Sequence, residues 1–181
     1  MIVPTAARSA EPAVAPTAAE RFEALWTEHY PSVVAYASRR AGPDVAADVA
    51  AGSFAVLWRR IDDPPAEPLP WLYAVARREL ANQRRGDNRR EALRSRLRLG
   101  RPDRYPVPDP ADGATEGLRA RSALARLRPA DREVLMLVAW EGLDPAQAAA
   151  ALGISPAAFA VRLHRARRRL ESQLTDSKDP A

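Results

Sequence analysis

The side chains with the clearest chemistry are the arginines of residues 156–170, and that chemistry is the binding of anionic groups such as phosphate. Five arginines and no acidic residue lie between Ser155 and Leu170. The planar guanidinium forms paired hydrogen bonds with phosphates and with guanine edges. The alternative is a solvated face, because cations are favourable near a helix C-terminus, but such a face would be better served by mixed charges at i, i+4 spacing. We therefore predict a helix that binds a polyanion.

This basic helix is the second of two helices joined by a tight turn. Asp144 is a suitable N-cap for the first helix, Pro145 fits its first position, and Gln147 completes a capping box. Gly153 can end that helix in the left-handed conformation, and Ser155 can cap the next one. So few residues separate the two helices that they must cross sharply, as in a helix-turn-helix. The helical period then gives the second helix a buried stripe of Phe159, Leu163, Ala166 and Leu170, and outward or flanking positions at Val161, Arg162, His164, Arg165, Arg168 and Arg169.

A second basic segment follows an aromatic pair in the N-terminal half of the chain. Residues 77–101 contain ten arginines and three acidic residues. Just before them, Trp71 and Tyr73 follow a loop, residues 61–70, in which four prolines oppose helix formation. Aromatic rings beside a cationic track are typical of proteins that hold unpaired bases. Three other aromatic residues lie in apolar-periodic helices and are predicted to be core residues: Tyr30, Tyr36 and Trp58.

The sequence lacks the motifs of an enzyme. It has no Gly-rich phosphate loop, no nucleophile elbow and no helical pair of histidines. With no cysteine, and with His29 and His164 far apart, it offers neither a reactive thiol nor a zinc cage. Asp62 and Asp63 could form a carboxylate pair for a metal, but no third ligand is close in sequence, so we interpret them as loop residues. We expect no catalysis, no metal and no cofactor.

Composition favours a globular protein with an anionic partner. The 181 residues are 46% hydrophobic, which is sufficient for one domain or two small ones. The net charge is +5, and 27 of the 28 basic residues are arginine, which favours a polyanion. No apolar run is long enough to cross a membrane. Residues 1–19 contain Arg8, Glu11 and several prolines rather than a signal-peptide core, so we expect a cytoplasmic protein without membrane insertion.

Apolar residues recur with the helical period along the chain, and no segment of useful length has the period of a strand. We therefore predict an all-α fold of two small helical domains, the second containing the helix-turn-helix. Residues 100–117, rich in proline and acidic residues, form a linker that spans up to about 60 Å at ~3.3 Å per residue, which would let the domains bind two separated DNA segments. The predicted boundaries are a disordered tail 1–19, a first domain 20–98, a linker 99–117, a second domain 118–174 and a tail 175–181.

Within these domains, the helix ends are marked by glycine and proline. We predict a first helix from Glu20 to Ala41, ended by Gly42 and Pro43, and a second that starts at Pro43 or Asp44. A third begins after the proline loop at Trp71. In the second domain, helices are predicted over 118–127 and from Pro129 to Gly142, before the capped pair.

Several stretches, taken in order, resemble one protein family. In the first domain these are Phe22-Glu23-Ala24-Leu25, His29-Tyr30-Pro31, Asp48-Val49-Ala50-Ala51-Gly52-Ser53-Phe54 and Trp71-Leu72-Tyr73-Ala74-Val75-Ala76-Arg77. In the second they are Leu127 with Arg132-Glu133-Val134-Leu135, Glu141-Gly142-Leu143, Leu152-Gly153-Ile154-Ser155 and Arg162-Leu163-His164-Arg165-Ala166-Arg167. Together they resemble the bacterial sigma factors of the extracytoplasmic-function (ECF) group, the compact kind that has only regions two and four. The resemblance covers about residues 20–98 and 118–174.

The resemblance implies a dissociable subunit of RNA polymerase that selects promoters and starts strand opening, with no chemistry of its own. The expected contacts to the beta-prime clamp helices are Asp48, Val49, Ala51, Gly52 and Phe54. The loop 62–70 would capture a flipped minus-ten base, at a cost of a few kcal/mol that a shaped pocket and a cationic track can offset. The expected minus-ten residues are Asp62, Asp63, Trp71, Tyr73, Arg77, Arg78, Asn82, Arg84 and Arg85.

For the second domain, the resemblance implies recognition of the minus-thirty-five major groove and contact with the beta flap. The expected minus-thirty-five residues are Ser155, Ala158, Arg162, His164, Arg165, Arg168 and Arg169. An anti-sigma regulator is a further expected partner. The acidic linker would run through polymerase channels that otherwise accept nucleic acid.

The chain departs from the family pattern at a few positions. Ala51 and Gly52 stand where the family usually has Gln and Glu, and Gly52 weakens its helix by up to about 1 kcal/mol. Arg78, where Asn is frequent, could shift the minus-ten preference. Ala158, Ala160 and Val161 replace Thr, Lys and Ser, so base readout would depend on Arg162 and Arg165, with thymine-methyl contacts and DNA shape in addition.

Two other functions compete with this interpretation. A two-module helix-turn-helix regulator that does not bind polymerase would explain the second domain equally well, but not the proline loop, tryptophan and arginine series of the first. An RNA-binding adaptor or nucleic-acid enzyme is the other, and the lack of acidic clusters argues against the enzyme. Binding to core polymerase and to single-stranded DNA distinguishes these possibilities.

Overall fold

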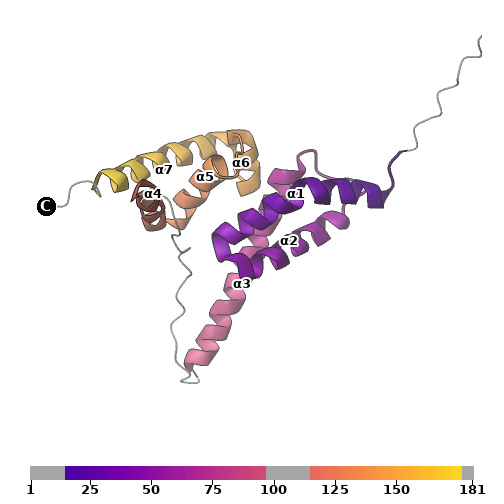
Figure 1. Ribbon diagram of the computed structural model, residues 1–181, viewed down its shortest axis with the longest axis horizontal. Coiled ribbons are helices and arrows are strands. Elements are labelled where there is room, and N and C mark those ends of the chain that lie inside the picture. Colours follow the sequence, from indigo (N-terminus) through magenta and orange to yellow (C-terminus); the bar gives the residue numbers. More distant parts are fainter. Residues whose placement is uncertain (1–14, 97–114, 177–181) are drawn as a thin grey trace, which may run out of the picture.

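The computed structural model describes residues 15–96 and 115–176, and the side chains among them except those of 87–88, 91–96, 115–119 and 176. Residues 99–114 of the predicted linker 99–117, and most of both predicted tails, lie outside the described residues, and the last three linker residues belong to α4. Over the described part the chain forms seven helices and no strand, which confirms the all-α prediction (Figure 1). The helices are α1 (Ala18–Ala41), α2 (Pro43–Trp58), α3 (Pro68–Arg96), α4 (Thr115–Arg126), α5 (Pro129–Ala139), α6 (Pro145–Leu152) and α7 (Pro156–Asp176).

Helix α1 begins two residues before the predicted start at Glu20, because Thr17 caps it. The Glu20 backbone N–H donates to the Thr17 hydroxyl at 3.2 Å, and the Thr17 backbone N–H donates to the Glu20 carboxylate at 2.7 Å. This reciprocal pair is a capping box, and its hydrogen bonds lower the pKa of Glu20. The helix continues through Pro31 and ends, as predicted, before Gly42, whose φ of 89° is a conformation that favours glycine.

Helices α1, α2 and α3 pack against one another and form the N-terminal module. Its largest fully buried side chains include Val33, Tyr36, Val49, Phe54, Leu57 and Leu72. One core prediction is wrong: Trp58 is 47% exposed, because it ends α2 on the side away from that core. The predicted proline loop is also shorter than expected. Helix α3 starts at Pro68, since prolines are tolerated in a first helical turn, where an N–H has no partner to lose.

Helices α4 to α7 form the C-terminal module, in which α7 packs across α4, α5 and α6 (Figure 1). The predicted buried stripe of α7 is confirmed at Phe159, Leu163 and Ala166. The end of α4 is fixed by Arg132 of α5, which donates from Nε to the Leu124 carbonyl at 2.9 Å. The predicted start of this helix at residue 118 was three residues late.

The helix-turn-helix has the predicted caps. The Asp144 carboxylate accepts from the backbone N–H groups of Ala146 and Gln147 at 2.8 and 2.9 Å, and Gln147 completes the capping box. Gly153 adopts the left-handed conformation with φ 67°, and the Ser155 hydroxyl accepts from the Ala158 N–H at 3.2 Å. Helices α6 and α7 are bent from each other by 100°. No single helix in the described ranges is long and apolar enough to span a membrane, although α6 and α7 together meet the length and composition criteria.

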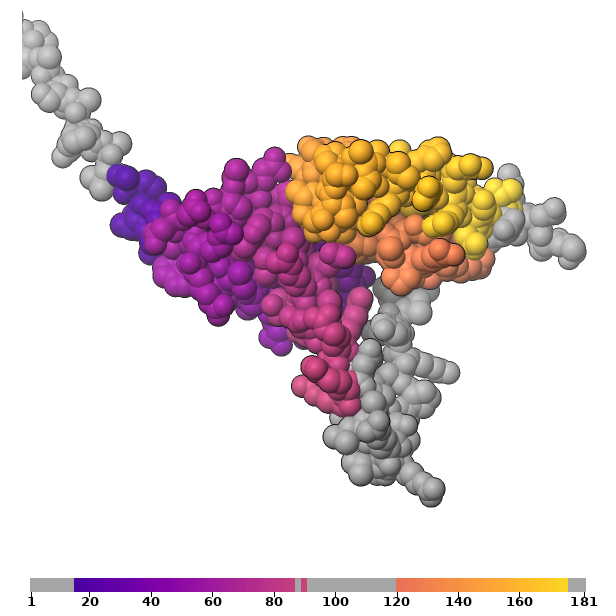
Figure 2. All heavy atoms as spheres, turned by 180° about the vertical axis from the view of Figure 1, so that it is seen from behind, coloured from indigo at the N-terminus to yellow at the C-terminus, as the bar shows by residue number. Residues whose placement is uncertain are grey.

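The two modules are in contact with each other. Helix α6 packs against α3, and the buried apolar residues of both modules belong to one contiguous cluster. Seen from behind, the surface of the C-terminal module, in orange and yellow, adjoins that of the N-terminal module without a gap (Figure 2). The sequence predicted two independent domains and did not predict this interface.

Candidate nucleic-acid interface

The outer face of α7 presents basic side chains that no other residue in the described ranges neutralises. Arg162, His164, Arg165 and Arg168 are exposed, and none forms an ion pair or side-chain hydrogen bond within the residues that the structure describes. Val161, among them, is 50% exposed. Helix α7 follows α6 across a bend of 100°, and in a helix-turn-helix the second helix of such a sharply crossed pair is the one that enters the major groove.

Arg169 differs from the other predicted binding arginines of α7. Its Nη1 donates to Asp131, a buried residue in the first turn of α5. This pair joins α7 to α5 and occupies part of the Arg169 guanidinium. Ala158 is half-buried, and the Ser155 side chain is engaged in capping, so the exposed side chains in the first half of α7 are mainly those that follow these two residues.

Helix α3 carries the second cationic face. Arg77, Arg78, Asn82, Arg84 and Arg85 are all exposed, as the predicted strand-binding role requires. Arg85 donates to the Asn82 side-chain oxygen, which orients the two side chains together. Arg84 donates from Nη2 to the backbone carbonyl of Arg40 at 3.1 Å and so connects α3 with the end of α1.

The loop between α2 and α3 is held by an arginine that sequence reasoning missed. Arg21 of α1 donates from Nη2 to Asp62 at 3.0 Å, from Nε to the Ile61 carbonyl at 3.3 Å, and from Nη1 to the Pro16 carbonyl at 2.6 Å. Asp62 and Asp63 are exposed. Their partner is 40 residues away in sequence, so no local signal marks it. No group of three potential metal ligands gathers here or elsewhere in the described ranges.

The two aromatic residues predicted to stack on bases lie in different environments. Trp71 is half-buried at the start of α3, with the Arg60 guanidinium 5.9 Å from its ring centroid. Tyr73 is 2% exposed and stacks on Tyr36, with ring centroids 4.6 Å apart. Burial raises the pKa of Tyr73 to about 12. The structure therefore places Tyr73 in the core and not on a base-stacking surface, because the two-residue step from Trp71 to Tyr73 amounts to about half a helical turn and brings Tyr73 to the inward face of α3.

The predicted polymerase-binding segment of α2 divides in the same way. Asp48 and Ala51 are exposed and Gly52 is half-buried, whereas Val49 and Phe54 are 1% and 0% exposed. The helical period turns Val49 and Phe54 inward to α1 and α3, so these two side chains support the face and do not form its surface.

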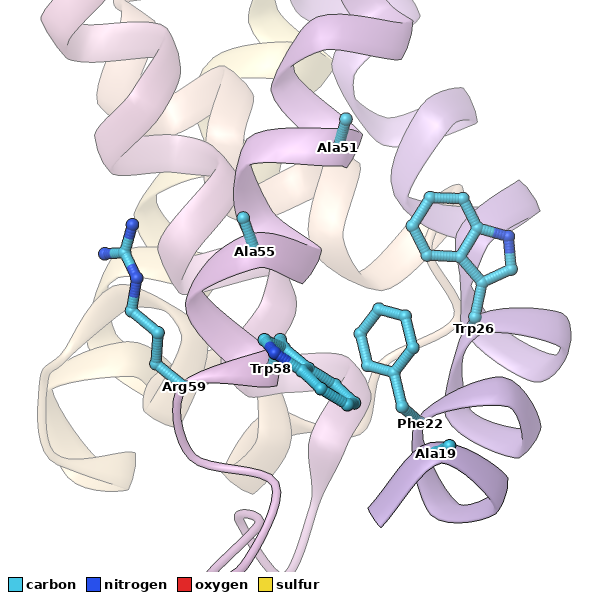
Figure 3. Close-up of a pocket in the computed structure, with 7 residues that line it drawn as sticks. All are labelled: Ala19, Phe22, Trp26, Ala51, Ala55, Trp58 and Arg59. Atoms are coloured by element: carbon cyan, nitrogen blue, oxygen red, sulfur yellow. The ribbon is translucent and has the colours of Figure 1, made fainter.

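Beside Ala51 lies an apolar groove between α1 and α2 that the sequence did not reveal. Figure 3 shows its lining, with Phe22 between Trp58 and Trp26. The Phe22 ring meets Trp58 edge-on at 5.1 Å, and Trp26 stacks on Tyr30 at 4.2 Å. Such a strip of exposed aromatic surface is typical of a protein-binding site.

A cluster of charged groups joins the two modules. Arg40, at the end of α1, donates from Nε to Glu133 at 2.9 Å and from Nη1 to Glu141 at 2.8 Å. Arg39 also donates to Glu141, and the Tyr36 hydroxyl donates to Glu133 at 2.9 Å. The side chains of Arg40 and Glu141 are only 6% and 1% exposed. The partners are about 100 residues apart, so the pairing has no sequence signature.

Burial and charge act against each other in this cluster. Burial disfavours the Arg40 charge, but Tyr36, Glu133 and Glu141 favour it, and its pKa lies above the ordinary value. Burial, helped by Glu133, also raises the pKa of Tyr36, which therefore stays a hydrogen-bond donor. Among the residues that the structure describes, Arg40 Nη2 is a buried donor without a hydrogen-bond partner, and such a group costs about 1–3 kcal/mol. The junction is thus specific, but its net stabilisation is small.

Comparison with known proteins places this geometry in a family. Residues 25–90 match the family described as Sigma-70 region 2, and residues 118–170 match Sigma-70, region 4. The ECF RNA polymerase sigma factor SigL of Mycobacterium tuberculosis is 32% identical over 157 residues, which cover 84% of this chain and 88% of SigL. The chain belongs to the ECF sigma factors. The family resemblance inferred from the sequence is thereby confirmed.

Solved structures of other sigma factors share this fold. RpoE of Bartonella quintana, in complex with the anti-sigma factor NepR, superposes with a TM-score of 0.66 at 24% identity, over 85% of this chain and 96% of RpoE. CnrH, in complex with the cytosolic domain of CnrY, superposes with a TM-score of 0.58 at 25% identity, over 90% and 96% of the two chains. CnrH of Cupriavidus metallidurans is also a sequence relative, at 31% identity over 70% of this chain and 72% of its own.

In this ECF sigma factor the exposed members of the predicted site lie in three parts of the fold. The arginines of α3 and the loop that Arg21 holds make one, and the first turns of α7 make another. The exposed part of α2 with the aromatic groove makes the third. As an ECF sigma factor the protein binds RNA polymerase and directs promoter-specific initiation of transcription.

Proposed function

We propose that the N-terminal module holds the opened minus-ten strand along the exposed face of α3. Arg77 and Arg78 supply two cations without an ion pair in the described residues, and Trp71 stands at the start of the same helix. The loop at Asp62 and Asp63 would hold the flipped base, positioned by Arg21. Cationic side chains that follow a backbone beside an aromatic ring are the usual elements of single-strand binding.

The C-terminal module would read the minus-thirty-five element in the major groove. Arg162 lies nearest the start of α7 and would reach a guanine edge, while Arg168 is placed for a phosphate. The exposed Val161 would contact a thymine methyl group, in place of the hydroxyl that the family usually has there. Arg169 would contribute less than predicted, because Asp131 holds it.

Polymerase would bind on the face of α2 that carries Asp48, Ala51 and Gly52, extended by the groove at Phe22 and Trp58. We place the beta-prime clamp helices there, and we assign contact with the beta flap to the C-terminal module. The groove supports this proposal because it supplies apolar area where Ala51 and Gly52 lack the usual polar groups. The chain would act without catalysis or cofactor, in the bacterial cytoplasm where polymerase works.

An anti-sigma protein is a further proposed partner. The solved RpoE is bound to an anti-sigma factor and the solved CnrH to the cytosolic domain of CnrY. Such a protein would bind the surfaces used for polymerase or DNA. Its binding would be detected as loss of transcription in the reconstituted system.

One observation carries the proposal: Arg77 and Arg78 of α3, which are exposed and form no ion pair in the described residues, lie on the helix that follows the loop anchored by Arg21. The test is run-off transcription with bacterial core polymerase and a library of genomic promoters. We expect start sites that depend on this chain, and we expect Arg77→Ala with Arg78→Ala to abolish strand opening while minus-thirty-five binding remains. A two-module regulator would bind duplex DNA without core polymerase and would produce no dependent start sites.

A further inference from the structure

Among the residues of α3 whose side chains the structure describes, Glu79 is the only acid, and it follows the strand-binding arginines directly. Two residues along a helix amount to about 200° of rotation, so Arg77 and Glu79 lie at opposite edges of the buried face of α3. The buried residues Ala76 and Leu80 lie between those edges. Glu79 is therefore turned away from the edge that carries Arg77.

The side chain of Glu79 meets α2 at Gly52. Its Cγ lies 3.9 Å from the point that a Cβ on Gly52 would occupy, so its stem passes beside α2 at that residue. Helix α2 packs against α3, and Glu79 and Gly52 are both half-buried. Because Gly52 has no side chain, no group of α2 at that position covers the end of Glu79. The space that Gly52 leaves on α2 is thus open to a side chain from α3.

The carboxylate of Glu79 has no partner among the residues that the structure describes. Four acids with described side chains are buried or half-buried. Three of them pair with arginine: Asp131 with Arg169, and Glu133 and Glu141 with Arg40. Glu79 forms no hydrogen bond or ion pair in the described ranges. A carboxylate that has lost part of its water gains from a cation, and for Glu79 that cation must come from another molecule.

The position of Glu79 widens the face that we assign to polymerase. Asp48 and Gly52 are four residues apart and share one side of α2. The groove at Phe22 and Trp58 borders this face on the side of α1, and Glu79 borders it on the side of α3. All three helices of the N-terminal module then contribute to one surface, although the predicted contacts belong to α2 alone.

We infer that Glu79 is a polymerase-contact residue, which delivers a carboxylate from α3 to the place of the missing side chain at Gly52 and pairs with a basic side chain of the polymerase. This inference rests on the proposed placement of polymerase on α2. The partner group is a lysine or arginine, because the other half-buried acids of this chain are neutralised by guanidinium groups.

Binding of the full chain to purified bacterial core polymerase tests the role of Glu79. Glu79→Gln keeps the shape of the side chain and removes its charge, and we expect core affinity to fall about three- to tenfold. The affinity of the variant should also depend less on salt than that of the parent, since salt screens the ion pair. The matched control is Glu28→Gln, at an exposed acid of α1 two residues after Trp26 and so on another side of that helix from the groove. This control should bind core polymerase as the parent does.

Moving the carboxylate from α3 to α2 distinguishes a contact from a role in folding. Glu79→Ala should weaken core binding as Glu79→Gln does. Adding Gly52→Glu should restore affinity to within about twofold of the parent, because the new side chain starts where the old one passed. Adding Gly52→Gln instead supplies the same shape without the charge and should restore nothing. Equal affinity of the parent, Glu79→Gln and Glu79→Ala would overturn the inference, and so would equal rescue by Gly52→Gln.

Two variants on the α2 face separate this inference from the proposed function. If Trp58→Ala and Asp48→Asn weaken core binding while Glu79→Gln does not, polymerase binds α2 without Glu79 and only this inference fails. If Glu79→Gln weakens core binding while the other two do not, the contact of Glu79 is confirmed and the proposed placement on α2 fails. Tighter binding of Glu79→Gln to a single-stranded minus-ten fragment, with unchanged core affinity, would overturn the inference and assign Glu79 to repulsion of DNA.

Discussion

Arg162 and Arg169 belong to the same helix and the same basic run, yet only Arg162 is available to a partner. Two turns of α7 separate them, and Asp131 of α5 holds Arg169. Arg40 has a third environment, in which two carboxylates and a tyrosine ring surround it. A count of arginines therefore predicted a polyanion partner for the chain, but the structure was needed to say which arginines are free to meet it.

Arg21 gives a prediction about the minus-ten loop. Arg21→Gln removes the guanidinium that pairs with Asp62. The shorter glutamine side chain also loses the hydrogen bond to the Ile61 carbonyl. We expect open-complex formation, measured by permanganate footprinting, to fall severalfold. The free energy of unfolding should fall by only about 1 kcal/mol, because these hydrogen bonds are partly exposed.

The control for that experiment is Arg121→Gln, which removes an exposed arginine of α4 that has no partner in the described residues. Equal effects of the two substitutions would show that net charge, and not the anchoring of the loop, limits opening. Duplex binding at the minus-thirty-five element should be the same in both variants.

Gly52 offers a gain in stability at a site within the α2 face. A Cβ at this position would lie 3.9 Å from the Glu79 Cγ, an ordinary contact distance. Gly52→Ala should therefore stabilise the chain by about 0.5–1 kcal/mol, because it removes backbone freedom from the unfolded state. Thermal unfolding of this 181-residue chain should show a midpoint about 1–4 °C higher.

Gly153 provides the opposite control. Its φ of 67° is a left-handed conformation, so Gly153→Ala should lower the midpoint although the space around it is open. If the unfolding midpoint of Gly52→Ala is also lowered, then the packing of α2 against α3 at Glu79 requires a residue without a Cβ.

At the scale of elements, helix α7 should combine base readout with phosphate contact. Arg162→Ala is expected to cost about 1–3 kcal/mol against the preferred base and little against others. Arg168→Ala should weaken binding to all sequences alike and reduce the salt slope by about one. Binding measured over a set of minus-thirty-five variants and salt concentrations separates the two effects. If both substitutions weaken binding to all sequences equally, Arg162 does not take part in base readout.

The groove between α1 and α2 predicts a strong contact with polymerase. Trp58 is 47% exposed and touches Phe22 edge-on at its rim. Trp58→Ala should weaken binding to core polymerase by about tenfold or more, because interface tryptophans are frequent hot spots that cost about 2 kcal/mol or more on truncation. Leu174→Ala, at another exposed apolar residue on α7, is the control and should have little effect on core binding. If core affinity is unchanged in the Trp58 variant, the groove serves another purpose.

The elements were predictable where their ends are chemically marked. Asp144, Gly153 and Ser155 fixed the helix-turn-helix from the sequence because caps and left-handed glycines act within three or four residues. The start of α1 was missed at Thr17 although the same kind of capping box marks it. Burial on α3 was harder to predict: Tyr73 follows the Trp71 ring by two residues, and only packing against Tyr36 decides that it faces inward.

At the scale of the whole molecule, sequence reasoning predicted two helical modules and the family but not their contact. Arg39 and Glu141 are 102 residues apart, and each taken alone resembles an ordinary surface charge. Periodicity and capping describe neighbours in sequence, whereas this pair depends on where a linker allows the second module to dock. The hydrogen bond from Arg21 to Asp62 was not predicted for the same reason, because the two residues are 41 positions apart in sequence.

The tyrosines at the junction make stability sensitive to alkaline pH. Burial raises the pKa of Tyr73 to about 12 and that of Tyr36 further, whereas the unfolded chain loses these protons near pH 10. Below pH 10 both states hold the protons, and this contribution to stability is complete. Above it the unfolded state binds fewer protons, so stability should fall with pH, by up to about 1.4 kcal/mol per unit for each tyrosine.

Denaturant unfolding between pH 8 and pH 11, with tyrosinate absorbance recorded in parallel, measures this dependence at ~25 °C, the temperature to which the expected slope applies. Tyr73→Phe should reduce the slope, since one raised pKa is lost while the ring that stacks on Tyr36 remains. Ionisation of Tyr36 would place a phenolate beside Glu133, so the modules should also separate as the pH rises. A flat stability profile through pH 11, with both phenols titrating near pH 10, would mean that solvent reaches this junction and that the two modules are not packed against each other in solution.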